Sequence, residues 1–400
     1  MSDLVMGAGH SAAPDTRAAV REAASIARRA LGSQEPRLAI VAATVDHDAS
    51  VVHAAFREAL PGVPLHGATT SLGVLTGSGV VMGTNGGVGV LLLGAGQDAS
   101  FAVGSSDLAE GAREAGRKAA QALASSGPAG EPPRLVFIAV TPGREEEILA
   151  GIADVLPGVP VFGGSAADHT IEGIWSIFTD RTVLREGVTL AGLWGASVRI
   201  GAVIEGPYEP TDKRAVITAS NGRAIETLDG RPATEVLHGW IGDSIAAEVR
   251  EGGNLLMQTA VTPVGIARGD DATQPFYLLL HPAHAHPEGR IDVFAEAPQG
   301  ATVCLMSGSA DSLVGIVDRL VDRCLAVANI EPRDARGAFL IYCAGCAGAV
   351  GGRIEEVLSR LQGRLGDIPI LGFCTFGEQG HVPGVGNVHS NLSVSLVVAG

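Results

Sequence analysis

The 400-residue sequence is poor in basic and in aromatic residues. It has 28 lysines and arginines against 43 acidic residues, a formal net charge of −15, and only 4% aromatic residues. No run of basic residues is longer than Arg28-Arg29. Because nucleic acids and anionic membrane surfaces are bound through clustered basic side chains, the sequence argues against both as partners. The core has to be built from Ala, Val, Leu and Ile.

Long hydrophobic runs and a cysteine framework are also missing. The longest nearly unbroken apolar and glycine run, around 86–96, is shorter than the ~20 residues of a membrane-spanning helix. The first five residues lack the basic flank and apolar stretch of a signal peptide. Five scattered cysteines indicate reduced thiols. We therefore expect a soluble, cytoplasmic protein that does not insert into membranes.

Glycine is the residue in excess. The 55 glycines are close to twice the average share of about 7%, and they follow no G-x-y period, which excludes collagen. One glycine-containing segment recurs. Residues 61–67 (PGVPLHG) reappear as 157–163 (PGVPVFG), with a looser third copy at 368–372 (IPILG). The sequence therefore contains a unit that is used three times.

Each copy of the segment follows the same pattern of elements. Apolar runs at 37–41, 134–138 and 339–342 are typical of buried strands, and each precedes a helical pattern and then the Pro-x-x-Gly segment. In the second unit, Glu145-Glu146-Glu147 form an acidic first turn, which complements the helix dipole. A right-handed crossover makes the two strands of such a strand–helix–strand unit parallel.

Further strands follow each unit. The pattern predicts a pair at 74–82 and 88–93, joined by a turn at 84–87, and a second pair at 174–178 and 188–194. A strand at 392–398 closes the third unit. If these pairs are antiparallel, the sheets are mixed. The predicted fold is α/β, with repeated strand–helix–strand units and added antiparallel strands.

The chain divides into two predicted parts. A change of pattern near 205–213 separates residues 15–204, which hold two similar units, from residues 205–400, which end in the third. The second part begins with short strands and a helix at 233–241. A loop is predicted at 280–290.

Several motifs in both parts resemble the FIST sensory domain family. Residues 371–378 (LGFCTFGE) resemble its G-F-x-x-x-G-E signature, and 228–233 (LDGRPA) resemble its L-D-G-x-P-A turn. The closing strand at 389–393 (HSNLS) and the segment 161–168 (VFGGSAAD) are similar to further FIST elements. The resemblance extends over nearly the whole chain and implies a FIST N part followed by a FIST C part.

Two motifs depart from the family pattern. The first unit lacks the acidic residue of the usual G-x-S-T-x-G-E element, and Cys346 replaces the Arg of Cys-x-Gly-Arg. The resemblance implies a module that senses a small molecule, such as an amino acid, and that takes part in signal transduction. Because no kinase, cyclase or receiver signature is present, we expect a stand-alone sensor with a small-molecule ligand and a possible signalling partner.

Glycines, hydroxyls and acids at the strand ends are the predicted binding site. Ligands of open α/β sheets lie beyond the carboxyl ends of parallel strands. Backbone N–H groups and hydroxyls there could hold a carboxylate, and Asp168 or Glu378 an amine; equally, the glycines could only form turns and the two acids only cap loops. The predicted ligand-binding residues are Thr69, Thr70, Ser71, Gly163, Gly164, Ser165, Asp168, Cys343, Gly372, Cys374, Thr375, Glu378 and Asn391.

An alternative function is a thiol-dependent or redox enzyme. Cys343 and Cys346 lie between a strand and a helix, where a thiol pKa can be lowered, and Cys374 ends a neighbouring strand. Simple burial of small residues is the favoured reading. His281, His284 and His286 lack the partner spacing of a zinc site, and no nucleotide-binding loop is present, so we expect neither a metal nor another cofactor.

Overall fold

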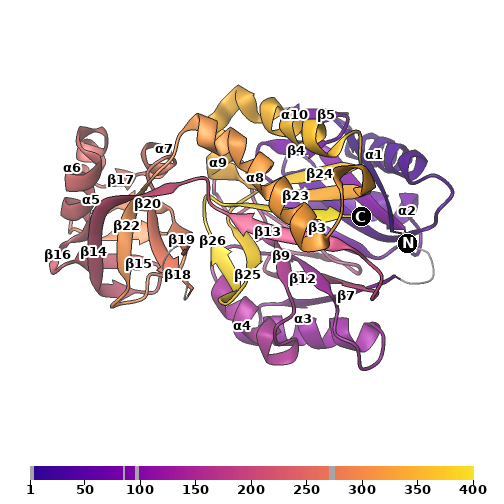
Figure 1. Cartoon of the computed structure of the whole chain (residues 1–400), viewed down its shortest axis with the longest axis horizontal. Helices are drawn as coiled ribbons and strands as arrows, with labels where there is room; N and C mark the ends of the chain where they lie inside the picture. The colour runs from indigo at the N-terminus through magenta and orange to yellow at the C-terminus, as the bar shows by residue number, and fades with distance from the viewer. Residues whose placement is uncertain (1–3, 84–85, 95–98, 270–274) are drawn as a thin grey trace.

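The computed structural model describes residues 4–83, 86–94, 99–269 and 275–400, whose strands form four sheets. Three six-stranded sheets with helices on their outer sides form a larger body. The fourth sheet lies in a smaller body at the left of Figure 1. The α/β fold with mixed sheets, predicted from the sequence, is confirmed.

The first unit has two strand–helix steps, a third strand, a hairpin and a closing strand. Its elements are β1 (Val5–Ser11), α1 (Thr16–Leu31), β2 (Pro36–Thr44), α2 (Ala49–Ala59), β3 (Leu65–Thr70), β4 (Gly73–Thr76), β5 (Gly79–Met82) and β6 (Val88–Gly94). Strands β2 and β3 are parallel, and β6 runs antiparallel to both β1 and β2. Asp15 and Asp48 accept backbone hydrogen bonds at the starts of α1 and α2.

The second unit repeats this order. Its elements are β7 (Ser100–Asp107), α3 (Ala112–Ser126), β8 (Leu135–Val140), α4 (Glu145–Val155), β9 (Val161–Ser165), β10 (Ile177–Phe178), β11 (Val183–Leu184) and β12 (Gly187–Trp194). Strands β8 and β9 are parallel, as predicted, and β12 is antiparallel to β8 and β7.

The third unit has the same order but is interrupted after its first strand. Its elements are β13 (Ile200–Glu205), α8 (Ala310–Ala328), β23 (Gly337–Cys343), α9 (Ala344–Val350), α10 (Ile354–Leu365), β24 (Ile370–Thr375), β25 (Glu378–Val382), β26 (Gly386–Ser390) and β27 (Val394–Ala399). Strands β23 and β24 are parallel. All three predicted strand–helix–strand units are therefore present.

The interruption is a separate small body that we call the inserted domain, residues 209–307. Its elements are β14 (Glu209–Asn221), β15 (Ala224–Leu228), β16 (Arg231–Pro232), α5 (Ala233–Ile241), α6 (Ala246–Glu251), β17 (Gly253–Asn254), α7 (Leu256–Thr259), β18 (Val264–Arg268), β19 (Phe276–Leu280), β20 (Pro282–Ala285), β21 (Ile291–Val293) and β22 (Thr302–Ser307). The predicted loop at 280–290 is wrong in part, because residues 282–285 form β20. The division of the chain at 204/205 stays a prediction.

The three units exchange their hairpins in a ring. Hairpin β4–β5 of the first unit joins the sheet of the third, β10–β11 of the second joins the first, and β25–β26 of the third joins the second. The predicted pairing of 74–82 with 88–93, and of 174–178 with 188–194, is therefore wrong, because these strands belong to different sheets. Of the turn predicted at 84–87, residues 84 and 85 lie outside the described residues.

Glycine lets the first strand of each unit touch a helix backbone. Gly7, Gly104 and Gly201 are evenly spaced in the sequence. A Cβ atom at these positions would lie 2.2 Å from the Ala27 carbonyl oxygen, 2.2 Å from that of Ala119 and 1.9 Å from that of Cys324. Real Cβ contacts are never so short, so only glycine fits. Part of the glycine excess therefore reflects repeated packing of helix on strand.

The inner faces of the three sheets share one core. Phe137 of the second unit packs edge-to-face on Phe339 of the third, with ring centroids 5.6 Å apart, and Phe339 packs on Phe373 at 5.3 Å. Leu38 and Ile40 of the first unit belong to the same buried cluster. This shared core fixes the strands that end at the candidate site.

Candidate ligand site

The ends of β3, β9 and β24 meet and are joined in a ring. Three backbone hydrogen bonds link each strand end to the next: Ser71 N–H to the Cys374 oxygen at 2.9 Å, Ala167 N–H to the Thr69 oxygen at 2.9 Å, and Phe376 N–H to the Ser165 oxygen at 3.2 Å. The donors occupy matching positions after the three Pro-x-x-Gly segments, and so do the acceptors. The strand ends are therefore related by an approximate threefold arrangement.

All predicted ligand-binding residues are buried in or beside this region. The structure brings the three predicted strand ends together, although they are far apart in the sequence. Whether these residues bind a ligand stays a prediction. The residues concerned are Thr69, Thr70, Ser71, Gly163, Gly164, Ser165, Asp168, Cys343, Gly372, Cys374, Thr375, Glu378 and Asn391.

The two threonines of the first unit bond to backbone groups of the other units. The Thr70 hydroxyl accepts a hydrogen bond from the Cys374 N–H at 2.8 Å. The Thr69 hydroxyl accepts one from the Ser176 N–H at 2.9 Å. Because these groups are buried, the hydrogen bonds pair polar atoms whose burial without a partner would destabilise the folded protein. In this state the two threonines hold the units together.

Asp168 organises the loop that follows β9. One carboxylate oxygen accepts hydrogen bonds from the N–H groups of Thr170 and Ile171, and the other from those of Gly173 at 2.8 Å and Ile174 at 3.0 Å. Ile171 adopts a left-handed φ of 63°, which is rare for a β-branched residue. The carboxylate thus caps a loop, one of the two roles predicted for it.

Glu378 is a fully buried carboxyl group in the third unit. It accepts a hydrogen bond from the Thr375 hydroxyl at 2.8 Å and one from the Ser393 N–H at 3.0 Å. Burial raises the pKa of Glu378 well above its usual value, and the neighbouring Cys343 thiol raises it further. The raised pKa favours the neutral acid form of Glu378.

Glu145, at the start of α4, is a second buried carboxyl group with the opposite behaviour. Only 1% of its side chain is exposed. The Gly143 N–H donates to it at 2.9 Å and the Ser165 hydroxyl at 2.7 Å. Burial raises the pKa of Glu145, but the electrostatic interactions with His389 and Arg223 and the hydrogen bonds from Ser165 and Arg223 outweigh it, so the pKa lies below its usual value. Glu145 is a carboxylate at neutral pH.

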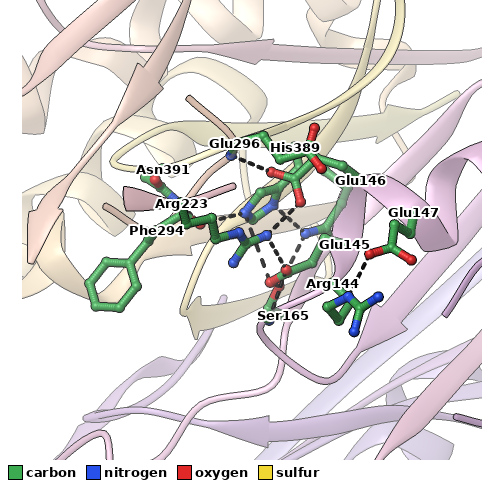
Figure 2. A network of polar contacts seen from close by, with 12 residues as sticks. Arg144, Glu145, Glu146, Glu147, Ser165, Arg223, Phe294, Glu296, His389 and Asn391 are labelled. Atoms are coloured by element: carbon green, nitrogen blue, oxygen red, sulfur yellow. Dashed lines mark hydrogen bonds and ion pairs between the residues drawn. The ribbon is translucent and has the colours of Figure 1, made fainter. Parts of the chain in front are cut away.

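Arg223 reaches Glu145 from the inserted domain (Figure 2). It lies in the turn between β14 and β15, and its Nη2 donates to Glu145 at 2.6 Å and to Glu146 at 2.5 Å. The Glu296 N–H, also in the inserted domain, donates to Glu146 at 2.8 Å. An ion pair therefore connects the inserted domain to the second unit.

The third unit adds His389 and Asn391 to the same junction (Figure 2). His389 lies with Nδ1 3.0 Å from the Gln379 amide nitrogen and Nε2 3.2 Å from the Phe294 carbonyl oxygen. The Asn391 side chain accepts a hydrogen bond from the His281 N–H at 3.2 Å. Residues of two core units and the inserted domain thus share one polar cluster.

Most of this junction was not predicted from the sequence. Ser165 and Asn391 were predicted, Glu145 was interpreted only as an acid suited to a helix start, and neither Arg223 nor Gln379 was singled out. Among the other residues, His389 carried a signal, because it lies in the closing motif at 389–393. A single arginine after a hairpin glycine carries no pattern that predicts a buried partner.

The thiols lie inside the third unit. Cys343, Cys346 and Cys374 are buried, and the Tyr208 hydroxyl lies 3.7 Å from the Cys346 sulfur. Burial raises the pKa of Cys374 to about 12, and a hydrogen bond with Cys346 together with burial raises that of Cys343 well above its usual value. Thiols are poor nucleophiles under these conditions, which disfavours the enzyme alternative.

We expect these three cysteines to resist iodoacetamide in the native protein at pH near 8. Burial makes all three sulfur atoms inaccessible, and the raised pKa values of Cys343 and Cys374 keep those two thiols protonated. Mass spectrometry of tryptic peptides checks this: the native sample should stay unlabelled while a urea-unfolded control is labelled at all three. Rapid native labelling of Cys343 would show an accessible thiolate and favour the enzyme.

The histidines at 281, 284 and 286 are not placed together as a set of metal ligands. In the part of the chain that the structure describes, no group of three or more potential ligands is placed to hold a metal ion. His281 is buried, with Nε2 2.9 Å from the Leu256 carbonyl oxygen, and burial lowers its pKa to about 4. His286 lies 2.7 Å from a carboxylate oxygen of Asp292.

Two surface cavities lie elsewhere. One, of about 480 Å³, is lined by Pro207, Gly308 and Arg319, among others, where the inserted domain joins β13 and α8. The other, of about 520 Å³, lies between α1 and the end of α2. Neither includes a predicted ligand-binding residue, and the predicted residues themselves are buried.

Comparison with known families identifies the class of protein. The FIST N domain matches residues 37–231 and the FIST C domain matches residues 233–381. The chain therefore belongs to the FIST family, as the motifs predicted, and FIST domains are sensory domains. No helix among the described residues is long and apolar enough to cross a membrane.

Similar curated proteins carry names that assign them no function. One from Mycobacterium tuberculosis is 28% identical over 251 residues, which cover 61% of this chain and 62% of that protein. One from Mycobacterium bovis is 27% identical over 251 residues, 61% of each chain. One from Methanocaldococcus jannaschii is 30% identical over 99 residues, 24% of this chain and 19% of that protein. The match thus spans about three fifths of the mycobacterial relatives.

A solved structure with some likeness is a cyanuric acid hydrolase from A. caulinodans. It has a TM-score of 0.27 and 11% sequence identity, and the match covers 47% of this chain and 71% of that chain. This likeness is too low to bear on the function.

Proposed function

We propose that the protein is a stand-alone cytoplasmic sensor that binds a small ligand, an amino acid or a similar metabolite. The ligand would bind where the ends of β3, β9 and β24 meet the inserted domain. One observation carries the proposal: buried carboxyl, hydroxyl and amide groups gather at this junction between two bodies. Burying polar groups of this kind lowers the stability of the fold unless they are hydrogen-bonded. Convergent polar groups of this kind are also a feature of ligand-binding sites.

The chemistry of the junction suits a ligand with both charged ends. The Glu145 carboxylate can accept from an ammonium group. Glu378, whose raised pKa favours the neutral acid, can in that form donate to a carboxylate, and its partner Thr375 offers a hydroxyl. These groups lie on strands and at a helix start, which are rigid supports for a site.

Ligand entry requires the inserted domain to move. The domain is joined to the core by two short connections, around 206–208 and at 308–309. Polar contacts such as Arg223 with Glu145, and Asn391 with His281, hold it in place. A ligand that binds the open form more tightly than the closed form shifts the population toward the open form. The size of the shift is set by the difference between the two affinities. A signalling partner would recognise the changed surface.

We expect an amino acid or related metabolite to raise the Tm of the protein and to bind saturably in titration calorimetry. Replacing Asp168 or Glu378 by Ala should weaken binding at least about tenfold, which corresponds to the loss of roughly one hydrogen bond to a charged group. Glu251→Ala, at an exposed position of the inserted domain, is the matched control. If no metabolite binds, or if both variants bind like the unaltered protein, the proposal fails.

A further inference from the structure

Arg223 has features of an internal ligand. Its guanidinium belongs to the inserted domain, but its ion-pair partners Glu145 and Glu146 belong to the core. The side chain is 20% exposed and the Glu145 side chain 1%. A cation from one body thus fills an anionic site in the other.

The core holds the anionic site without help from Arg223. The Gly143 N–H and the Ser165 hydroxyl each donate to the Glu145 carboxylate, and both residues belong to the second unit. When the inserted domain moves away, these bonds remain. Glu145 is then a positioned carboxylate that has lost its strongest partner, and such a group favours any cation that can replace it.

The polar cluster at the start of α4 contains more carboxyl groups than cationic groups. Figure 2 shows them: Glu145, Glu146, Glu147 and Glu296, with Arg144 and Arg223. Glu147 forms an ion pair with Arg144. Arg223 forms ion pairs with both Glu145 and Glu146. A third carboxyl group, Glu296, lies close enough that burial and the charge of Glu146 raise its pKa. Negative charge exceeds positive charge here, so the cluster favours a cation over an anion.

Arg223 uses only part of its hydrogen-bonding capacity in these contacts. Both ion pairs with the glutamates run through Nη2. A guanidinium can donate to two carboxylates through several N–H groups in a fixed fork. A free guanidinium ligand is not fixed to a hairpin, so it can orient itself to donate hydrogen bonds from more of its N–H groups.

We infer that Arg223 is a displaceable plug: a ligand with a guanidinium or primary ammonium group takes its place against Glu145 and Glu146 and releases the inserted domain. The inference rests on the proposed function and narrows its ligand to cationic metabolites. It also assigns Arg223 a regulatory role, because the plug and the ligand compete for one site. Weakening the plug should therefore increase the affinity for the ligand.

Chemical rescue of an Arg223→Ala variant tests the plug. The variant should lose roughly 5 °C or more in Tm, because a buried carboxylate loses its partner. Millimolar methylguanidinium chloride should restore Tm saturably, whereas sodium chloride at equal ionic strength should not. The same addition should raise the Tm of the unaltered protein less, because there Arg223 competes for the site. Arg250→Ala, an exposed arginine of the inserted domain, is the control and should show neither effect.

The Glu145→Gln/Arg223→Ala double variant shows whether rescue acts at this carboxylate. It should be more stable than Arg223→Ala alone and should not respond to methylguanidinium. Unchanged stability of Arg223→Ala, absence of rescue, or equal rescue of the double variant overturns the inference.

The unaltered chain gives an independent test if Arg223→Ala does not fold. Millimolar agmatine should increase hydrogen exchange in the hairpin around 221–224 and in the connections at 206–208 and 308–309; no increase overturns the plug. If the metabolite screen yields only ligands without a cationic group, this inference fails while the proposed function stands. If rescue occurs but no metabolite binds, the sensor role fails and the ion-pair contact remains.

Discussion

Gly201→Ala is expected to lower the free energy of unfolding by about 3 kcal/mol, as overpacked core positions do. The new Cβ would lie 1.9 Å from the carbonyl oxygen of Cys324 and 2.7 Å from its carbonyl carbon. Both are backbone atoms of α8, so no side chain can rotate away and the helix itself has to leave β13. Urea unfolding followed by circular dichroism measures the loss.

The matched control is Gly363→Ala in α10, where an added Cβ meets no atom within 4 Å. This exposed helical position should gain about 0.5–1 kcal/mol from the better helix propensity of alanine. Equal stability of Gly201→Ala and the unaltered protein would show that α8 and β13 are not in backbone contact.

Glu145→Gln and Glu378→Gln are expected to have opposite consequences at pH near 7. Glu145→Gln removes the charge that pairs with Arg223 and should cost about 3 kcal/mol. Glu378→Gln puts a neutral amide of the same shape at a site where the raised pKa favours the neutral acid, so it should cost much less than Glu145→Gln. Denaturant unfolding of both variants measures the difference, and a larger loss for Glu378→Gln would contradict the assignment of charges.

The pH dependence follows from the direction of each pKa shift. The native pKa of Glu145 lies below its ordinary value of 4.5, so its contribution to stability is present above that pH and is lost as the pH falls through the native pKa. The native pKa of Glu378 lies above 4.5, so its contribution is present below that pH and is lost as the pH rises through the raised native pKa. Relative to Glu378→Gln, the unaltered protein should therefore lose stability as the pH rises above about 4.5.

The repeated Pro-x-x-Gly segment was enough to predict three strand–helix–strand units and mixed sheets. The exchange of hairpins could not be predicted, because a short strand such as β10 pairs equally well with any exposed sheet edge. Which edge it meets depends on how the three units close into a ring. Gly7, Gly104 and Gly201 did carry a signal, because they are evenly spaced in the sequence.

The candidate site was predicted as far as it depends on strand ends. Parallel strands of equivalent units end at equivalent places, so the segments after Gly67, Gly163 and Gly372 could be expected to meet. The contribution of the inserted domain could not be expected. Arg223 reaches Glu145 only because β14 and β15 place the tip of their hairpin over the second unit. The local sequence contains no pattern that predicts this placement.

Native mass spectrometry of the protein with an added pool of amino acids and amines tests the central claim, a small-ligand site at the junction of the inserted domain and the strand ends. The account predicts one bound molecule per chain, carrying a cationic group, on the unaltered protein, and its loss from Glu145→Gln. A bare chain mass at saturating pool concentrations, or the same bound molecule on Glu145→Gln, would contradict it.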